Sequence, residues 1–142
     1  MTVDGLGPIR AAQVVAVVVV PERFRTKRQF WSYCGLGLVS RSSSDWEKDS
    51  STGSWRRRSV AQTRGLNRNR SPMLKNVFKG AAQTVIGMRT HPLSKDYARM
   101  LESGTKPNLA TLTIARRIAA AVLAIWKHKE VYAREKHRST AA

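Results

Sequence analysis

The segment between Asp49 and Asp96 contains no carboxylate, and this one-sided charge constrains the chain more than any other feature. Its cationic side chains are Arg56, Arg57, Arg58, Arg64, Arg68, Arg70, Lys75, Lys79, Arg89 and Lys95. Because they have no local counter-charge, they need either abundant solvent or an external polyanion. The whole chain has the same bias, with 26 Lys and Arg against 9 Asp and Glu and a net charge of +17. Such a field attracts phosphate backbones, which release counterions on contact. Nucleic acid is therefore the predicted partner.

Length and composition permit one folded domain, with or without a tail. The 42% hydrophobic content is enough for a core. A single cysteine, Cys34, excludes an internal disulfide framework and a zinc site made of cysteines alone, which favours a reducing, cytoplasmic setting. The apolar run from Val14 to Val20 is shorter than the ~20 residues of a spanning helix and ends at Pro21. It also lacks the flanks of a secretory signal, so we expect no membrane association.

Hydrophobic periodicity predicts a mainly α fold with a small β-hairpin or loop element near residues 36–60. The expected elements are helices over 9–19, 24–33, 72–87, 92–103 and 109–128, a strand after Gly35, a polar loop or loose hairpin over 40–54, a return strand over 55–60, a second basic loop over 63–70 and a flexible basic tail over 131–142. Ser71 and Pro72 supply a hydroxyl cap and a first-turn proline. The last three helices should supply most of the core.

The N-terminal turn Gly5-Leu6-Gly7-Pro8 precedes the first expected helix. A glycine turn of this kind presents backbone N–H groups, and helix-hairpin-helix modules use such turns to hold DNA phosphates. Gly5 and Gly7 are therefore candidate phosphate contacts. The alternative is a simple turn into a core helix.

Serine is the only candidate nucleophile that the sequence suggests. The residues His91, His128 and His137 lack metal-ligand spacing, the carboxylates form no pair, and no phosphate-binding loop for a nucleoside triphosphate is present. Ser42 and Ser43 follow Arg41 and precede the Arg56–Arg58 cluster, so guanidinium groups could stabilise charge at an attacked phosphodiester. The alternative is a flexible serine loop without chemistry.

Several short motifs occur in a fixed order along residues 3–130. They are Gly5-Leu6-Gly7-Pro8, Arg23-Phe24 through Phe30, Tyr33-Cys34-Gly35-Leu36, Arg41-Ser42-Ser43, Thr63-Arg64-Gly65-Leu66-Asn67 and Leu74-Lys75. In this order the chain resembles the C-terminal transposase domain of the IS-one-ten (IS116/IS110/IS902-like) family of insertion-sequence transposases. These are bridge-RNA-guided serine recombinases of the DEDD type.

The resemblance implies DNA transposition through a serine that attacks DNA and forms a covalent phosphoserine link. The matching position is Ser43, with Ser42 as the alternative because the register is open by one residue. Full-length relatives also carry an N-terminal RuvC-like domain whose acidic residues bind divalent metal such as Mg²⁺. We expect that domain to be absent from this chain, and we expect no metal site or cofactor in the chain itself. We therefore expect little or no recombinase activity from the chain alone.

The sequence thus supports two functional readings. The first is a DNA-binding transposase fragment whose partners are DNA, a guide (bridge) RNA and either a RuvC-like half or further copies of itself. The second is a non-catalytic basic nucleic-acid-binding protein or an inactive remnant of an insertion element. The expected nucleic-acid contacts are Gly5, Gly7, Arg25, Lys27, Arg28, Arg41, Arg56, Arg57, Arg58, Arg64, Asn67, Arg68, Arg70 and Lys75.

Overall fold

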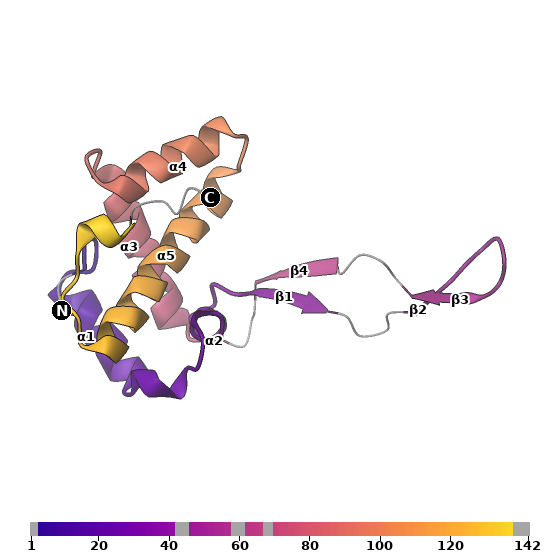
Figure 1. The fold of residues 1–142 in the computed structure, drawn as a ribbon, viewed down its shortest axis with the longest axis horizontal. Helices are drawn as coiled ribbons and strands as arrows, with labels where there is room; N and C mark the ends of the chain where they lie inside the picture. The colour runs from indigo at the N-terminus through magenta and orange to yellow at the C-terminus, as the bar shows by residue number, and fades with distance from the viewer. Residues whose placement is uncertain (1–2, 42–45, 58–61, 67–69, 138–142) are drawn as a thin grey trace.

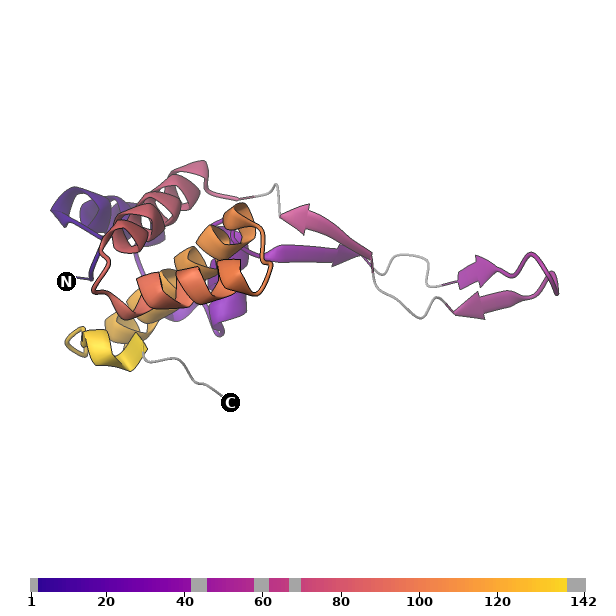
Figure 2. The ribbon, with the colours of Figure 1, turned by 90° about the horizontal axis from the view of Figure 1, so that it is seen from above.

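The computed structural model describes residues 3–41, 46–57, 62–66 and 70–137. In chain order the elements are α1 (Pro8–Val18), η1 (Pro21–Arg23), α2 (Lys27–Tyr33), β1 (Leu38–Arg41), β2 (Trp46–Lys48), β3 (Trp55–Arg57), β4 (Gln62–Leu66), α3 (Pro72–Gly87), α4 (Pro92–Glu102), α5 (Pro107–His128) and η2 (Arg134–His137). The helices gather into one body, and the four strands form an arm that projects from it (Figures 1 and 2). The predicted mainly α fold is confirmed.

Capping residues in the sequence set where the helices begin. The Thr26 side chain accepts a hydrogen bond from the backbone N–H of Gln29 at 3.3 Å and opens α2. The Ser71 hydroxyl accepts one from the N–H of Leu74 at 3.4 Å and opens α3. Proline occupies the first turn of α1, α3, α4 and α5, where its missing N–H costs nothing.

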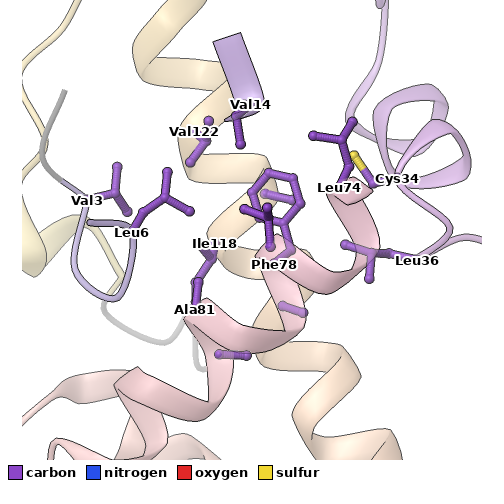
Figure 3. Packing of buried hydrophobic residues seen from close by; sticks show 14 of the residues in the cluster. Val3, Leu6, Val14, Cys34, Leu36, Leu74, Phe78, Ala81, Ile118 and Val122 are labelled. Atoms are coloured by element: carbon purple, nitrogen blue, oxygen red, sulfur yellow. The ribbon is translucent and has the colours of Figure 1, made fainter. Parts of the chain in front are cut away.

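The core forms where α3 and α5 pack against each other. Phe78 of α3 and Ile118 and Val122 of α5 lie in its centre, and side chains from α1 and from the segment after α2 close it (Figure 3). The buried positions of α3 recur three or four residues apart, which gives the helix one apolar face. The Phe30 ring packs edge-on against the Phe78 ring, with their centroids 5.8 Å apart.

Helix α5 is long and apolar enough to cross a membrane by length and composition alone. Half of its most apolar window is buried against the rest of the protein, and it packs against α2, α3 and α4. Length and composition alone do not separate a spanning helix from a core helix, and α5 contributes Ile114, Ile118 and Val122 to the core here.

A polar cluster ties the C-terminal segment to the start of the chain. The Asp4 carboxylate accepts a hydrogen bond from Arg134 Nε at 2.7 Å and lies 3.2 Å from Nε2 of the buried His91. The Tyr132 hydroxyl donates to the same carboxylate oxygen at 3.4 Å. The cluster therefore joins three segments: the N-terminal turn through Asp4, the N-cap of α4 through His91, and the segment after α5 through Tyr132 and Arg134.

The structure differs from the sequence expectations in four places. The helix expected over 24–33 begins only at Lys27, because Thr26 caps it. The expected basic loop over 63–70 is wrong for Thr63–Leu66, which belong to strand β4. Helix α5 begins at Pro107, earlier than the expected start at Asn108 or Thr111, because proline provides the first turn. Of the expected flexible tail, residues 131–137 include η2 and are held through Asp4, while residues 138–142 lie outside the described residues.

Candidate nucleic-acid interface

The arm consists of two short antiparallel ribbons that follow one another outward from the body (Figures 1 and 2). In the proximal ribbon β1 pairs with β4, with Leu38 opposite Leu66 and Arg41 opposite Gln62. The register shifts between Leu38 and Ser40. In the distal ribbon β2 pairs with β3. Its opposed pairs are Trp46 with Arg57, Glu47 with Arg56 and Lys48 with Trp55.

The turn at the tip of the arm is closed by its own hydrogen bonds. The Asp49 carboxylate accepts hydrogen bonds from the backbone N–H of Ser51 at 2.9 Å and from its hydroxyl at 2.6 Å. These bonds lower the pKa of Asp49. The Asp49 carbonyl accepts from the N–H of Gly53, whose φ of +66° suits glycine. The turn therefore uses its carboxylate internally and holds β2 and β3 in register.

The predicted nucleophiles Ser43 and Ser42 lie outside the described residues, as do Arg58, Asn67 and Arg68. The described residues on either side of the serine segment are Arg41, at the end of β1, and Trp46, at the start of β2. Both belong to the arm. The assignment of the nucleophile stays a prediction.

The strands of the arm carry four of the predicted nucleic-acid contacts. Arg41 lies in β1, Arg56 and Arg57 in β3, and Arg64 in β4. Three further predicted contacts, Arg25, Lys27 and Arg28, lie in the body at or just before α2 and are exposed. The predicted contacts thus divide between the arm and the face of the body that carries α2.

Arg70 and Lys75 lie where the chain returns from the arm into α3. The aliphatic part of Arg70 packs over Gly35, which has a φ of +71°, and a Cβ at Gly35 would lie 2.0 Å from Arg70 Cδ. Arg70 Nε is buried without a hydrogen-bond partner. Desolvation, followed by repulsion from Arg70 and Lys79, lowers the pKa of Lys75. An anion bound here would relieve that repulsion and supply acceptors, which fits the predicted role of Arg70 and Lys75.

A second arginine at the base of the arm was not found from the sequence. Arg116 of α5 donates from Nε to the Leu36 carbonyl at 2.6 Å, and its Nη2 is buried without a hydrogen-bond partner. Its guanidinium carbon lies 6.0 Å from the centre of the Trp31 ring. With Arg28 it lines a cavity of about 290 Å³ whose other walls are Trp31, Ser32, Gly37 and Leu38. The only signal for it was a charged pair, Arg116-Arg117, inside an otherwise apolar helix.

The N-terminal glycine turn has a packing role. The Leu6 N–H donates to the Val3 carbonyl at 2.8 Å, and Gly5 has a φ of +78°. A Cβ at Gly5 would lie 2.5 Å from the Ala81 carbonyl oxygen of α3, so no larger residue fits. Gly7 caps α1 and has no such neighbour. The simple-turn alternative accounts for Gly5, and phosphate contact by Gly5 or Gly7 stays a prediction.

Other catalytic chemistry finds little support in the part of the chain that the structure describes. Within it, no three His, Cys, Asp or Glu side chains are grouped to hold a metal ion. Cys34 is buried, and burial raises the pKa of its thiol, which keeps it protonated at neutral pH.

The comparisons with known proteins agree with the motif order in the first half of the chain. A family model described as Transposase IS116/IS110/IS902 family matches residues 1–63. No curated protein and no solved structure matches the chain. The matched residues run from before α1 into the beginning of β4 and include the serine segment. The match covers less than half of the 142 residues and supports a relation to this transposase family and a transposase-related role.

Proposed function

We propose that the chain is the serine-bearing, nucleic-acid-binding part of an insertion-sequence transposase. The observation that carries this proposal is the arm: the family match extends through β1, β2 and β3, and the arm's strands carry Arg41, Arg56 and Arg57. The function is DNA strand exchange in concert with a metal-binding partner domain. The helical body anchors the arm, and the cations at its base extend the basic surface.

The proposed reaction is transesterification by a serine hydroxyl. The oxygen of Ser43, or of Ser42 in the alternative register, attacks a DNA phosphorus atom and forms a phosphoserine ester. The bond from phosphorus to one deoxyribose oxygen breaks, that oxygen takes up a proton, and the serine proton passes to a base. In this proposal, arginines of the arm stabilise the charge that develops on the phosphate oxygens.

The proposal assigns metal chemistry to a RuvC-like domain, which would supply Mg²⁺ for DNA cleavage. Alone, this chain binds nucleic acid and has little or no recombinase activity. Its further partners, as the family resemblance implies, are a guide RNA and additional copies of the chain.

The decisive experiment measures covalent protein–DNA adducts with the chain and a RuvC-like half supplied together. Ser43→Ala should abolish the adduct and leave DNA affinity unchanged, while Ser54→Ala, which removes a hydroxyl from the tip turn, should leave both intact. Loss of the adduct in Ser42→Ala alone would move the nucleophile by one residue. An adduct that survives both serine variants, or that never forms in wild type, rejects serine catalysis and leaves a basic binding protein or an inactive remnant.

Salt dependence tests the binding part separately. If six to ten cations contact phosphate, affinity should fall by roughly three to five decades between about 50 and 200 mM salt. A flat response would mean that the charge of +17 serves solubility alone.

A further inference from the structure

Two tryptophans on the distal ribbon are exposed, unlike the other two in the chain. Trp46 is 59% exposed and Trp55 is 65% exposed. Trp31 and Trp126 are partly buried and pack against the core. An indole left in water contributes no burial to stability, so the two exposed rings need another explanation.

The strand register places both rings on one face. Trp46 lies opposite Arg57, and Trp55 lies opposite Lys48. Directly opposed residues of an antiparallel pair share a face, as do residues two apart along a strand. Trp46, Lys48, Trp55 and Arg57 therefore occupy the same face, and the two tryptophans are diagonal neighbours about 7–8 Å apart.

The distal ribbon lies far from the helices. Figures 1 and 2 both place β2 and β3 at the far end of the arm from the helical body. The tip turn fixes the two strands through the bonds of Asp49 to Ser51 and Gly53. A two-stranded hairpin is marginally stable in water, and a ligand that covers its aromatic face would stabilise it.

We propose that Trp46 and Trp55 form a stacking platform for unpaired nucleic-acid bases, beside which Lys48 meets the phosphate backbone. The proposal rests on the proposed nucleic-acid-binding function and assigns to the distal ribbon a recognition role distinct from serine chemistry. Aromatic side chains interleaved with cations are the means by which proteins hold single strands, because every base has a π-face. Bases in a duplex are already stacked and offer no free face.

Charge favours nucleic acid over a second copy of the chain as the occupant. Two copies that each carry +17 repel one another, and pairing two distal ribbons through this face would bring Lys48 and Arg57 of each close to those of the other. A nucleic-acid strand brings the opposite charge to the same face. The experiment must therefore distinguish self-association through the ribbon from the binding of single-stranded nucleic acid.

The test compares binding of a fluorescently labelled single-stranded oligothymidine, an oligouridine of equal length and a duplex. For the full chain we expect tighter binding to both single strands than to the duplex, with quenching of tryptophan fluorescence. Trp46→Ala and Trp55→Ala should each weaken single-strand binding roughly five- to hundredfold and leave duplex binding nearly unchanged. The double variant Trp46→Phe/Trp55→Phe should recover most of the affinity, because a ring remains.

Leu109→Ala provides the control. Leu109 is an apolar residue of α5 that is 52% exposed and has no ring, so its removal should leave single-strand binding unchanged. A preference for oligouridine over oligothymidine would identify RNA as the source of the bases, and the reverse would identify DNA.

Each other outcome overturns the proposal in a distinguishable way. If the full chain binds single strands and the alanine variants bind equally well, the stacking platform is rejected while nucleic-acid binding stands. If the alanine variants lose self-association in sedimentation without losing affinity for single strands, the ribbon is a protein interface. If the full chain binds no nucleic acid at about 50 mM salt, both the proposed function and the platform fail.

Discussion

The helical body and the arm differ in how much of their apolar surface is buried. In the body, apolar side chains such as Phe78 and Ile118 are fully or almost fully buried, and Asp96 is paired with Arg99 and Arg117. In the arm, two short ribbons have no core of their own, and Trp46 and Trp55 are exposed. The stability of the protein therefore resides in the body, while the features that fit nucleic acid gather in the arm and at its base.

The largest expected difference is between the stability lost when a buried ring is removed from the body and the stability lost when an exposed ring is removed from the arm. Phe78→Ala removes a fully buried ring from the contact between α3 and α5 and should lower the free energy of unfolding by about 3–5 kcal/mol. Trp55→Ala removes a larger but exposed ring and should change it by no more than about 0.5 kcal/mol. Urea denaturation followed by circular dichroism measures both. Comparable losses in the two variants would show that the arm is part of the cooperative fold.

Substitution of two glycines compares the stability cost of a change beside the body with that of a change at the tip of the arm. Gly35 and Gly53 both have positive φ, at +71° and +66°. Gly53→Ala in the tip turn meets open space, so it should cost only the left-handed backbone strain of about 1 kcal/mol. Gly35→Ala places its Cβ against Arg70 and should cost about 2–3 kcal/mol, because the arginine must move from its packed position.

DNA affinity gives the second readout for this pair. Gly35→Ala should also weaken DNA binding, since it displaces Arg70 at the base of the arm. Equal stability losses in Gly35→Ala and Gly53→Ala would contradict the packing of Arg70 over Gly35.

The body could be predicted from the sequence because its signals are local. Ser71 and Pro72 mark the start of α3, and the spacing of Leu74, Phe78 and Val85 marks its buried face. These features depend on neighbours within one or two helical turns, so periodicity and capping suffice.

The arm could be predicted only in outline. The sequence indicates a hairpin near residues 36–60, but the polar or small residues Thr63, Arg64 and Gly65 predict a basic loop where the structure has strand β4. Its strand character comes from pairing with β1, 21 to 28 residues earlier, and pairing at that distance leaves no periodic signal. Arg116 was missed for a related reason: its contact with the Leu36 carbonyl joins residues eighty positions apart.

Single arginine removals test whether phosphate contacts belong to the arm. Arg56→Ala should reduce the slope of log affinity against log salt by about 1, as expected for the loss of one phosphate contact. The matched variant Arg99→Ala removes the same charge from α4, where the guanidinium pairs with Asp96 at 3.2 Å, and should leave the slope unchanged. Fluorescence anisotropy with a duplex at several salt concentrations measures both slopes. Equal changes would mean that total charge, and not its position on the arm, governs binding.

The smallest expected effect concerns pH and the cluster that holds the C-terminal segment to the body. Nδ1 of His91 accepts a hydrogen bond from the Leu93 N–H at 3.1 Å and caps α4, so Nε2 carries the proton toward Asp4. Burial lowers the pKa of His91 below 6.5, an effect that the Asp4 charge partly offsets. Arg134, the largest influence on Asp4, helps to lower the pKa of that carboxyl below 3.8.

Both shifts act in the same direction. The unfolded chain takes up a proton at His91 as pH falls through about 6.5, whereas the native state resists it, so stability present at pH 7 is lost on acidification. The Asp4 contribution is lost only below about pH 3.8. Between pH 7 and 5 we expect a loss of about 1 kcal/mol, the size of one helix cap, because a protonated Nδ1 can no longer accept from Leu93.

Two histidine variants isolate this effect by thermal unfolding at pH 7 and pH 5. His91→Gln should be less stable than wild type at pH 7, and its stability should not fall further between pH 7 and pH 5. His128→Gln changes an exposed histidine at the end of α5, and its stability should fall between pH 7 and pH 5 as in wild type. DNA affinity of the arm, measured at constant salt, should stay the same in both variants, because the cluster belongs to the body. A pH response that His91→Gln leaves intact would place the titrating group elsewhere, and an affinity change in that variant would show that the arm and the C-terminal segment are coupled.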